Sequence, residues 1–582
     1  MCDIRFCRIP ASISSSAHET AIGLRKTNFP IALRVRAIGA ARNKHRETTI
    51  VNESNDRLGS PCVVVLATPA PVTHRTAEEN LGIGYLAAVL RNHGVTVVVI
   101  DGWLEGLNTE QLASRISRHD PDLIGFSCYR TNMERAMETI RLVKDSGSTA
   151  FSVAGGYGPT FHAEEFVRAG FDAAVRGEGE VPLLQLIAHV RSGTPSLAAI
   201  PGLTHRNGDD VVHNAAPAPK LPMDELPHPQ RDTLSLTIAR RSLVHVQSAR
   251  GCQASCTFCS IVAFERIAPG PTWRQRTIEN FVDEVENLWR RGATHFKVID
   301  DSFIEPPRDA EWCTALADEI ERRGISPRFR GSIRADRASD EVLRELARAG
   351  FFSFSCGIEN FSASALRRMA KRADVPANCR ALNAMKRYGL YVQAGHILFD
   401  DGTTVAELQD NYLLMRRYNW TISKGIFTEM YAAAGTNFTR KLRKTGELID
   451  ADSLGNSRYA VRDRTARAVY NALKKWHSHH STVYDKAIDP LSAPKALAAD
   501  ELAMFHRISV QLRDKDLDFF GAVLDIVAQD ISIDTIEMEV EELLDQRLRV
   551  SDEWYAAFER EVEAAYAHAG LVYDADPNPF LC

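Results

Sequence analysis

The sequence predicts an α/β protein with two successive α/β domains and a helical C-terminal domain. Apolar β-type runs alternate with amphipathic helical segments over residues 61–200, and the same alternation returns over residues 241–442. Only helical periodicity continues over residues 443–582. Strands alternating with helices are typical of parallel sheets. A chain of 582 residues is too long for one core, so we expect about three packed units.

The first alternation predicts a doubly wound, Rossmann-like sheet. We expect strands at 62–67, 95–100, 123–127 and 150–154, and helices at 81–93, 108–119 and 133–146. Ligands of such sheets bind beyond the carboxyl ends of the strands. Gly155 and Gly156 follow the last strand and would let a large ligand approach the backbone. A G-x-G-x-x-G run after the first strand is absent, which argues against a dinucleotide.

The second alternation predicts a parallel α/β barrel, in the form of a partial (β/α)6 TIM-type barrel. We expect strands at 243–248, 294–299, 328–334, 351–357 and 390–398, and helices at 280–292, 310–324, 340–350 and 377–389. Chemistry in such folds gathers at the C-terminal strand ends. Asp300 and Asp301 follow the second strand and are therefore candidate catalytic residues.

Cys252, Cys256 and Cys259 form a C-x3-C-x2-C triplet directly after the first strand of this domain. Three thiolates from one loop can hold three irons of a [4Fe–4S] cluster and leave the fourth iron open, whereas ferredoxin-type runs supply four cysteines. A structural zinc loop or three unrelated buried thiols are the alternatives. Zinc sites usually require a second pair of Cys or His at matching spacing, and none follows. The triplet therefore favours an open iron–sulfur site.

With these motifs, residues 243–442 resemble the radical S-adenosylmethionine superfamily. Phe258 precedes the third cysteine as in that family, and Ser332, Arg334 and Glu359 lie where the family has S-adenosylmethionine-contacting strands. The resemblance implies that the open iron chelates the amino and carboxylate groups of S-adenosylmethionine. It also implies that one electron cleaves the cofactor to give a 5′-deoxyadenosyl radical. Ala434-Gly435-Thr436 corresponds to the family's closing loop.

Two further features of this domain stand apart from the family pattern. Phe399-Asp400-Asp401-Gly402 occupies the place where relatives commonly read Gly-x-Pro-x-Glu-Thr. Tyr431, near the last expected strand, is a candidate donor of a proton or hydrogen atom, with a packed tyrosine as the alternative.

The first domain resembles the cobalamin-binding domain of the cobalamin-dependent radical S-adenosylmethionine enzymes. It has a Leu-Gly-x-Gly-Tyr-Leu helix at 81–86, a Gly-Gly loop at 155–156 and an Arg-Gly-Glu-Gly-Glu run at 176–180. The resemblance implies cobalamin contacts from Pro71, Gly82, Tyr85, Ser127, Gly155, Gly156, Tyr157, Gly177 and Glu178. The Asp-x-His-x-x-Gly motif is missing, which suggests a cobalt without that histidine ligand. His74 either approaches the cobalt or is a solvated loop residue.

The flanking and connecting segments carry weaker patterns. Residues 1–60 are rich in Arg, Ser and Ala and predict a poorly ordered extension or an over-long start, with a transit-like peptide as an alternative. Residues 201–240 predict a proline-rich linker. In the C-terminal domain we expect amphipathic helices at 458–476, 499–515, 516–530 and 551–569.

A histidine-rich run, His477-Ser478-His479-His480, lies in the C-terminal domain. It is either a metal site or a helix end favoured by the helix dipole, and the second interpretation is preferred.

Composition excludes several classes of partner. The net charge of −5 indicates neither nucleic acid nor an anionic membrane as a partner. No apolar stretch approaches the ~20 residues that a membrane-spanning helix needs. Three of the eleven cysteines form the triplet, and the others are scattered without paired spacing, which indicates a reducing, cytoplasmic location.

Together, the two resemblances imply a cobalamin-dependent radical S-adenosylmethionine C-methyltransferase that acts on an unactivated carbon of a small molecule, such as a natural-product precursor. The implied cofactors are a [4Fe–4S] cluster, S-adenosylmethionine and methylcobalamin, with an external electron donor such as flavodoxin or ferredoxin. One alternative is an enzyme of the same build that catalyses a rearrangement, cyclisation or oxidation without methyl transfer. Another is a cobalamin sensor or carrier whose cluster is vestigial. The sequence of the C-terminal domain does not identify the substrate.

Overall fold

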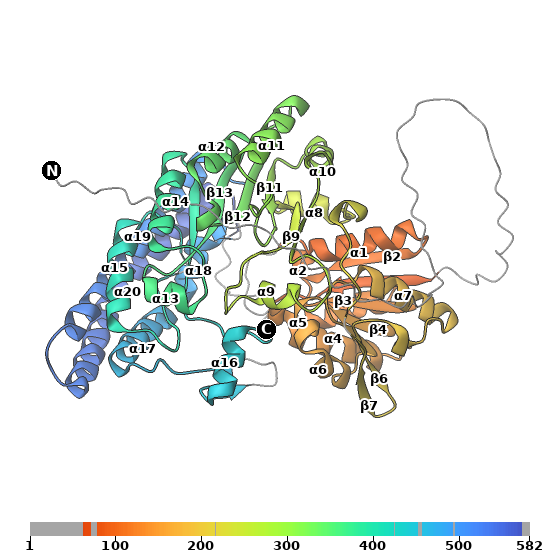
Figure 1. Ribbon diagram of the computed structural model, residues 1–582, viewed down its shortest axis with the longest axis horizontal. Coiled ribbons are helices and arrows are strands. Elements are labelled where there is room, and N and C mark those ends of the chain that lie inside the picture. Colours follow the sequence, from red (N-terminus) through yellow and green to blue (C-terminus); the bar gives the residue numbers. More distant parts are fainter. Residues whose placement is uncertain are drawn as a thin grey trace, which may run out of the picture. The chain divides into compact units, whose positions relative to one another are not determined.

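A computed structural model of the chain describes residues 62–71, 78–215, 217–423, 425–451, 457–492 and 495–572 (Figure 1). The expected extension at residues 1–60 and the loop residue His74 lie outside these described residues.

The first domain is a twisted sheet of seven strands in the order β2-β1-β3-β4-β5-β6-β7 (Figure 1). The first five strands are parallel, which confirms the doubly wound fold. They are β1 Val63–Thr68, β2 Thr96–Asp101, β3 Leu123–Ser127, β4 Phe151–Gly155 and β5 Ala173–Val175. The connecting helices are α1 Leu81–Asn92, α2 Gly102–Glu105, α3 Thr109–Ser117, α4 Met133–Asp145, α5 Tyr157–Phe161 and α6 Ala163–Arg168, and α7 Glu180–Ser192 follows β5. All expected strands and helices of this domain are present, with bounds that differ by at most two residues.

The last two strands of this sheet lie in the segment that the sequence analysis assigns to the linker. β6 Leu203–Asn207 pairs antiparallel with β5, and β7 Asp210–His213 pairs antiparallel with β6. Gly208, with φ +63°, and Asp209 form the tight two-residue turn of this hairpin. The prolines at 217–229 were the reason for predicting a linker from residue 201 onward. The sheet instead extends to His213, and the connection to the second domain begins after that residue.

The second domain is built on a parallel sheet in the order β14-β13-β12-β11-β8. Its strands are β8 Val244–Val246, β11 His295–Val298, β12 Arg328–Arg334, β13 Phe351–Glu359 and β14 Tyr391–His396. Its helices are α10 Ile278–Arg290, α11 Ala310–Arg323, α12 Asp340–Arg348, α14 Val375–Arg387 and α15 Val405–Arg417. All five expected strands are present. In the described residues the sixth position is reduced to isolated bridges, Gln393 to Ile422 and Phe399 to Glu429, so a complete (β/α)6 barrel is not formed.

The C-terminal domain is helical, as expected, and its last two helices are longer than predicted. They are α17 Arg464–His479, α18 Ser481–Ser492, α19 Ala499–Val527 and α20 Ile533–His568. The two helices predicted at 499–515 and 516–530 are the single helix α19. Asp516, at the predicted boundary, is buried within the continuous helix. The predicted helix at 551–569 is the second half of α20, and α18 was not predicted.

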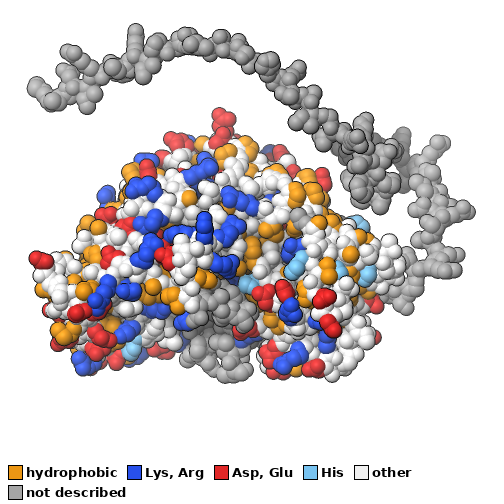
Figure 2. Space-filling view, turned by 60° about the horizontal axis from the view of Figure 1, so that its bottom comes forward, with side chains coloured by type: hydrophobic (Ala, Val, Ile, Leu, Met, Phe, Trp, Pro, Cys, Tyr) orange, Lys and Arg blue, Asp and Glu red, His pale blue; other side chains and the backbone are white. Residues whose placement is uncertain are grey.

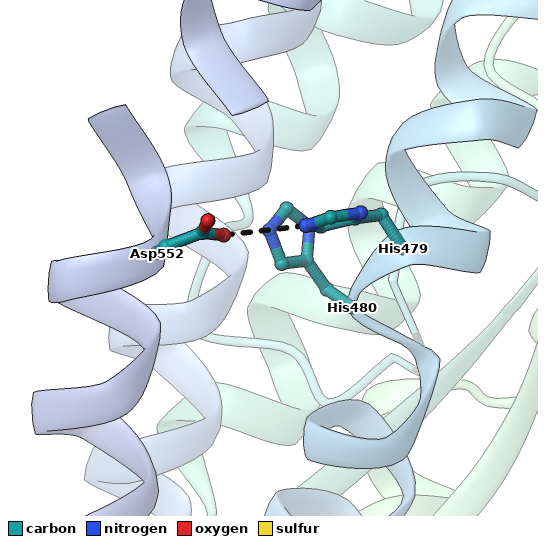
Figure 3. Close-up of side chains that lie close together, drawn as sticks. All are labelled: His479, His480 and Asp552. Atoms are coloured by element: carbon teal, nitrogen blue, oxygen red, sulfur yellow. Dashed lines mark hydrogen bonds and ion pairs between the residues drawn. The ribbon is translucent and has the colours of Figure 1, made fainter. Parts of the chain in front are cut away.

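His479 and His480 lie at the end of α17, beside Asp552 of α20 (Figure 3). The two nitrogens of His480 lie 3.0 Å from the carbonyl oxygen of Trp476 and 3.2 Å from the hydroxyl of Ser551. Its ring stacks on Tyr555 with a centroid separation of 3.6 Å. Because the chain itself uses both ring nitrogens, this geometry agrees with the helix-end interpretation and not with a metal site.

A buried ion network joins the first domain to the second. Arg231, in the connection, lies 3.3 Å from Glu79 before α1 and 2.5 Å from Glu284 of α10. Arg276 pairs with the other oxygen of Glu284. Burial alone would raise the pKa of the Glu284 carboxyl, but the two guanidinium groups hold it below its usual range. The side chains of Arg231, Glu79 and Glu284 are at most 5% exposed, so their charges depend on one another.

Removal of the central cation should therefore destabilise the protein. We expect Arg231→Met to lower the free energy of unfolding by about 3–5 kcal/mol, since it takes the cation from the buried Glu79 and leaves Glu284 with Arg276 alone. Urea unfolding followed by circular dichroism measures this change. The control is Arg322→Met, which removes an ion pair with Glu319 on the surface of α11 and should leave the midpoint nearly unchanged. An equal shift in the two variants would contradict the role of the network.

A second buried charge lies among the C-terminal helices. Asp516 of α19 is fully buried and accepts hydrogen bonds from the indole of Trp476, at 3.0 Å, and from the hydroxyl of Tyr484. Burial raises the pKa of this carboxyl to about 7 in spite of these two donors.

This carboxyl should make stability depend on pH. Its folded pKa of about 7 exceeds the unfolded value of about 3.9, so its stabilising contribution is complete below pH ~4 and is lost as pH rises to 7. Asp516→Asn removes the titration. We therefore expect the difference in urea midpoint, variant minus wild type, to increase from pH 5 to pH 8, with Trp fluorescence as the readout. Asp545→Asn, an exposed site on α20, should show no such trend.

Candidate functional site

The cysteine loop starts from a short antiparallel hairpin, β9 Ala249–Gly251 with β10 Trp273–Gln275, and ends at α9 Ser260–Glu265. Gly251 has φ +90°, and a Cβ there would lie 2.1 Å from the carbonyl oxygen of Thr272. Only glycine fits this position. The N–H of Cys252 then donates to the same Thr272 oxygen at 2.9 Å. The first cysteine is therefore fixed by the backbone of the hairpin.

The loop faces a cavity of about 280 Å³ at the carboxyl ends of β11 to β14. Its lining includes eight residues that the sequence analysis singles out: Cys252, Cys256, Phe258, Cys259, Asp301, Ser332, Arg334 and Glu359. They come from segments up to about 100 residues apart in the sequence. The structure thus brings the cysteine triplet and the expected S-adenosylmethionine contacts into one cavity.

All three thiols of the loop lie at the wall of this cavity, and Cys256 is buried. Burial raises the pKa of all three thiols, that of Cys252 to about 12, so iron binding must release their protons.

Glu359 presents its carboxylate to the cavity from a strained backbone. It has φ +60°, and the pairing of β13 with β14 shifts register between Gly357 and Glu359. Lys371 donates to the Glu359 carboxylate at 2.7 Å. A Cβ on Gly357 would lie 2.7 Å from the same carboxylate oxygen, so the ion pair requires glycine there. Strain of this kind is typical of functional positions.

Arg334, at the end of β12, is held between two carboxylates. It donates to Glu305 at 3.0 Å and to Asp336 at 2.6 Å. Glu305 is fully buried and also accepts from the thiol of Cys252 at 3.3 Å. Burial would lower the pKa of Arg334, but Asp336 and Glu305 keep it above its ordinary value. The guanidinium is thus a fixed positive charge at the wall of the cavity.

The inner wall of the cavity rests on a second buried arginine. Arg330 lies four residues before Arg334 on β12 and is 2% exposed. It donates to Ser353 at 2.8 Å and to Ser355 at 2.9 Å. It also donates to Gln393 of β14. Ser355 and Gln393 line the cavity, so Arg330 positions two of its polar groups. Burial lowers the pKa of Arg330 to about 10.

Lys371, Arg330 and Gln393 were not predicted from the sequence. Lys371 follows a short helix and belongs to no motif. A signal existed for the other two: Arg330 and Gln393 are polar at the positions of β12 and β14 that alternate with the apolar core residues Phe329 and Val392.

The two predicted catalytic aspartates differ in position. Asp301 lines the cavity and accepts the N–H of Gly251 at 2.9 Å, and burial raises its pKa to about 7. Asp300 is 2% exposed and outside the lining. It accepts the N–H and hydroxyl of Ser248 at 2.7 and 2.5 Å, and Arg308 lies 3.6 Å away. Asp300 therefore ties β8 to β11, and a catalytic contact is not supported for it.

Tyr431, the third predicted catalytic residue, is also outside the cavity lining. It is 37% exposed, and the guanidinium of Arg130, from the first domain, lies 4.4 Å from its ring centroid. This geometry agrees with the packed-tyrosine alternative.

The predicted cobalamin contacts of the first domain fall into two groups, and the first lies at the carboxyl ends of its strands. Pro71 follows β1, Ser127 ends β3, Gly155 to Tyr157 follow β4, and Gly177 follows β5. Ser127 and Gly155 border an apolar slot that also contacts Gly125 and Leu66. A Cβ on Gly125 would lie 2.8 Å from Leu66. Two of the predicted cobalamin contacts, Ser127 and Gly155, therefore line the same small apolar slot of about 30 Å³ at this edge of the sheet.

The second group contacts the second domain instead. Tyr85 is 3% exposed and lies under the guanidinium of Arg250, 4.9 Å from its ring centroid. Glu178 pairs with Arg274 and, at 3.3 Å, with Arg250. Both arginines belong to the β9–β10 hairpin. Tyr85 and Glu178 therefore hold the hairpin from which the cysteine loop starts, a role that the sequence did not predict.

Two other predicted contacts also have protein neighbours. The hydroxyl of Tyr157 donates to the carbonyl of Ala434 at 3.3 Å, and its ring stacks with Phe264 at 6.5 Å. A Cβ on Gly82 would lie 3.1 Å from the side-chain oxygen of Asn80, which caps α1. Tyr157 thus reaches the closing loop of the second domain.

Comparison with known families matches both domains. A B12 binding domain family matches residues 70–187, and the Radical SAM superfamily matches residues 246–414. The chain combines a B12-binding domain with a radical SAM domain. The resemblance to the cobalamin-dependent radical S-adenosylmethionine enzymes is confirmed, and with it the cofactors that the two domains imply.

Individual relatives of the chain carry different activities. It is 28% identical over 336 residues to an uncharacterized methyltransferase of Pyrococcus horikoshii, which covers 56% of this chain and 71% of that protein. An anaerobic magnesium-protoporphyrin IX monomethyl ester cyclase of Rubrivivax gelatinosus is 26% identical over 356 residues, 58% of this chain and 62% of the cyclase. The cobalamin-dependent radical SAM methyltransferase TokK of Streptomyces tokunonensis is 32% identical over 238 residues, 38% of this chain and 34% of TokK.

Among solved structures, the cobalamin-dependent S-adenosylmethionine radical enzyme OxsB has the same fold. The TM-score is 0.72 at 18% identity, with 90% of this chain and 83% of OxsB covered. No helix in the part of the chain that the structure describes is both long and apolar enough to cross a membrane.

Loss of one cluster thiol should abolish the cluster without unfolding the domain. We expect Cys256→Ala to lose bound iron and sulfide and the visible charge-transfer absorbance after anaerobic reconstitution, because two thiolates cannot hold the cluster. The control is Cys379→Ala, a half-buried thiol on α14 outside the cavity, which should keep all three signals. Full iron loading of the Cys256 variant would contradict the assignment.

Proposed function

We propose that this protein is a cobalamin-dependent radical S-adenosylmethionine C-methyltransferase that methylates an unactivated carbon of a small-molecule, natural-product type substrate. The observation that carries the proposal is the cavity in which the three cysteines meet Glu359, Arg334 and Ser332. A B12-binding domain is joined to the wall of this cavity through the β9–β10 hairpin.

The residues of the cavity have complementary chemistry toward S-adenosylmethionine. Cys252, Cys256 and Cys259 would hold the cluster. Glu359 offers a carboxylate that accepts N–H groups of the methionine ammonium, and Arg334 offers a guanidinium toward its carboxylate. When bound, the cluster and S-adenosylmethionine supply hydrogen-atom abstraction, and cobalamin supplies a methyl group.

The chain's own groups fix the cofactor rather than perform proton chemistry. Lys371 orients Glu359, Glu305 and Asp336 orient Arg334, and Arg330 orients Ser355 and Gln393. Each orienting group is at least half-buried, so little reorganisation is needed when a ligand binds.

The relatives support methyl transfer but leave a second candidate. TokK and the Pyrococcus protein are methyltransferases by name, which favours the proposal. The Rubrivivax relative is a cyclase, so a ring closure, rearrangement or oxidation without methyl transfer is the alternative.

The two candidates differ in one product. After anaerobic reconstitution with iron, sulfide and cobalamin, and on addition of reductant and S-adenosylmethionine, we expect 5′-deoxyadenosine and S-adenosylhomocysteine to accumulate together. S-adenosylhomocysteine is the product of methylating cobalamin from S-adenosylmethionine. Mass spectrometry of both products measures this outcome.

The other outcomes decide against the proposal. Deoxyadenosine without S-adenosylhomocysteine favours the non-methylating enzyme, and neither product from fully loaded protein favours a cobalamin binder. Cys256→Ala is the control, because a cluster-dependent activity must disappear in it while cobalamin binding remains.

A further inference from the structure

Two segments with exposed basic side chains border the cysteine loop directly. The N–H of Thr257, between two cluster cysteines, donates to the carbonyl of Met369 at 3.0 Å, just after α13 Ala363–Arg368. The carbonyl of Thr257 accepts from the N–H of Phe438 at 2.8 Å, in α16 Asn437–Thr445. Phe258 packs against the apolar cluster that α13 and α16 share. The two helices are therefore the immediate neighbours of the cluster ligands.

The outer faces of these segments carry cations without acidic partners. Five side chains are exposed, and none has a carboxylate within 4.0 Å among the described residues: Arg367, Arg372, Arg440, Arg443 and Lys444. Two acidic residues follow these segments: Asp374 caps α14, where it accepts the N–H of Ala377, and Glu447 pairs with Arg462 at 2.9 Å. We call these five residues the basic surface.

A buried acidic pair anchors the rim of the basic surface. Asp400 and Asp401 are each 2% exposed. Asp400 holds Arg368 at 2.9 Å, and Asp401 holds Lys441 at 2.8 Å and Arg462 at 3.1 Å. The side chains of Lys441 and Arg462 remain 47% and 54% exposed. The motif that departs from the family pattern thus uses its carboxylates internally and directs cationic groups outward.

This local charge opposes that of the whole chain. The net charge of the protein is −5, yet Lys and Arg side chains gather near the middle of the face drawn in Figure 2. A concentrated patch of one sign steers the association of a partner of the opposite sign and raises its on-rate. The partner that fits is acidic and must act at the cluster.

We propose that the basic surface docks an acidic one-electron donor protein of the flavodoxin type beside the cysteine loop. The inference rests on the proposed function, since only a cluster that must be reduced needs such a donor. In the step that docking serves, the flavin hydroquinone anion of the donor gives one electron to the oxidised cluster. The flavin becomes the neutral semiquinone, and the cluster becomes its one-electron-reduced form.

The test compares reduction of the reconstituted holoprotein by a bacterial flavodoxin, in its hydroquinone form, with reduction by dithionite. The triple variant Arg440→Glu, Arg443→Glu, Lys444→Glu should slow flavodoxin-driven cluster reduction by about tenfold or more, because charge steering is reversed. Its reduction by dithionite should match wild type. Stopped-flow absorbance and electron paramagnetic resonance of the reduced cluster are the readouts.

A matched control reverses three exposed cations elsewhere. Arg547, Arg549 and Arg560 lie on α20, which contacts α17, α18 and α19. Their replacement by Glu changes the net charge by the same amount and should alter the flavodoxin rate by no more than about twofold. Iron content is measured in both variants. If the α16 variant loses iron, the milder Gln triple replaces it.

Salt provides a test on the unmodified protein. The flavodoxin rate of wild type should fall as ionic strength rises and that of the α16 variant should not, while the dithionite rates stay constant. Equal flavodoxin rates in wild type and the α16 variant would overturn the proposal. Failure of the proposed function is distinguishable, because it would remove S-adenosylhomocysteine or cluster reduction with dithionite as well.

Discussion

The geometry of the site depends on how the β9–β10 hairpin is held. Arg250 and Arg274 of the hairpin pair with Glu178, and Arg250 also pairs with Glu180 at 2.8 Å and covers the ring of Tyr85. These acidic and aromatic groups belong to the B12-binding domain, and the cysteine loop starts at the next residue of the hairpin. The same contacts therefore set the loop and orient one domain against the other, as a reaction shared by two cofactors requires.

Charges at the site are placed where the backbone has little freedom. Gly251 permits the close approach to Thr272, and the positive φ of Glu359 aims its carboxylate at the cavity. The surrounding ion pairs hold these positions: Lys371 for Glu359, and Glu305 with Asp336 for Arg334. Because each charged group has its partner before any ligand arrives, the cavity is preorganised, which is how electrostatic groups contribute most.

The sequence located most strands and helices and eight of the residues that line the cavity. Period-two and helical patterns gave the strands and helices, the spacing of the cysteines gave Cys252, and the family resemblance gave Ser332 and Glu359. Lys371 and Gln393, which also line the cavity, belong to no motif and were not predicted. Side chains that act across the domain boundary followed no such pattern. Tyr85 and Glu178 belong to cobalamin-domain motifs, and only the tertiary structure shows that their partners are Arg250 and Arg274. The hairpin β6–β7 was not predicted, because its two strands are short and the prolines that follow them indicated a linker.

Asp400 and Asp401 stand where relatives have a different motif. This departure changes the charge of the nearby surface rather than a ligand site. A buried carboxylate pair without counter-ions would cost several kcal/mol, so the chain must supply cations, and it supplies Arg368, Lys441 and Arg462. Those side chains approach from α13, from α16 and from the segment before α17. Their charged ends pair with the two carboxylates, while the side chains of Lys441 and Arg462 remain 47% and 54% exposed. The buried acidic motif is therefore surrounded by the cations Arg368, Lys441 and Arg462. They form a basic rim close to Thr257, which lies between two cluster cysteines.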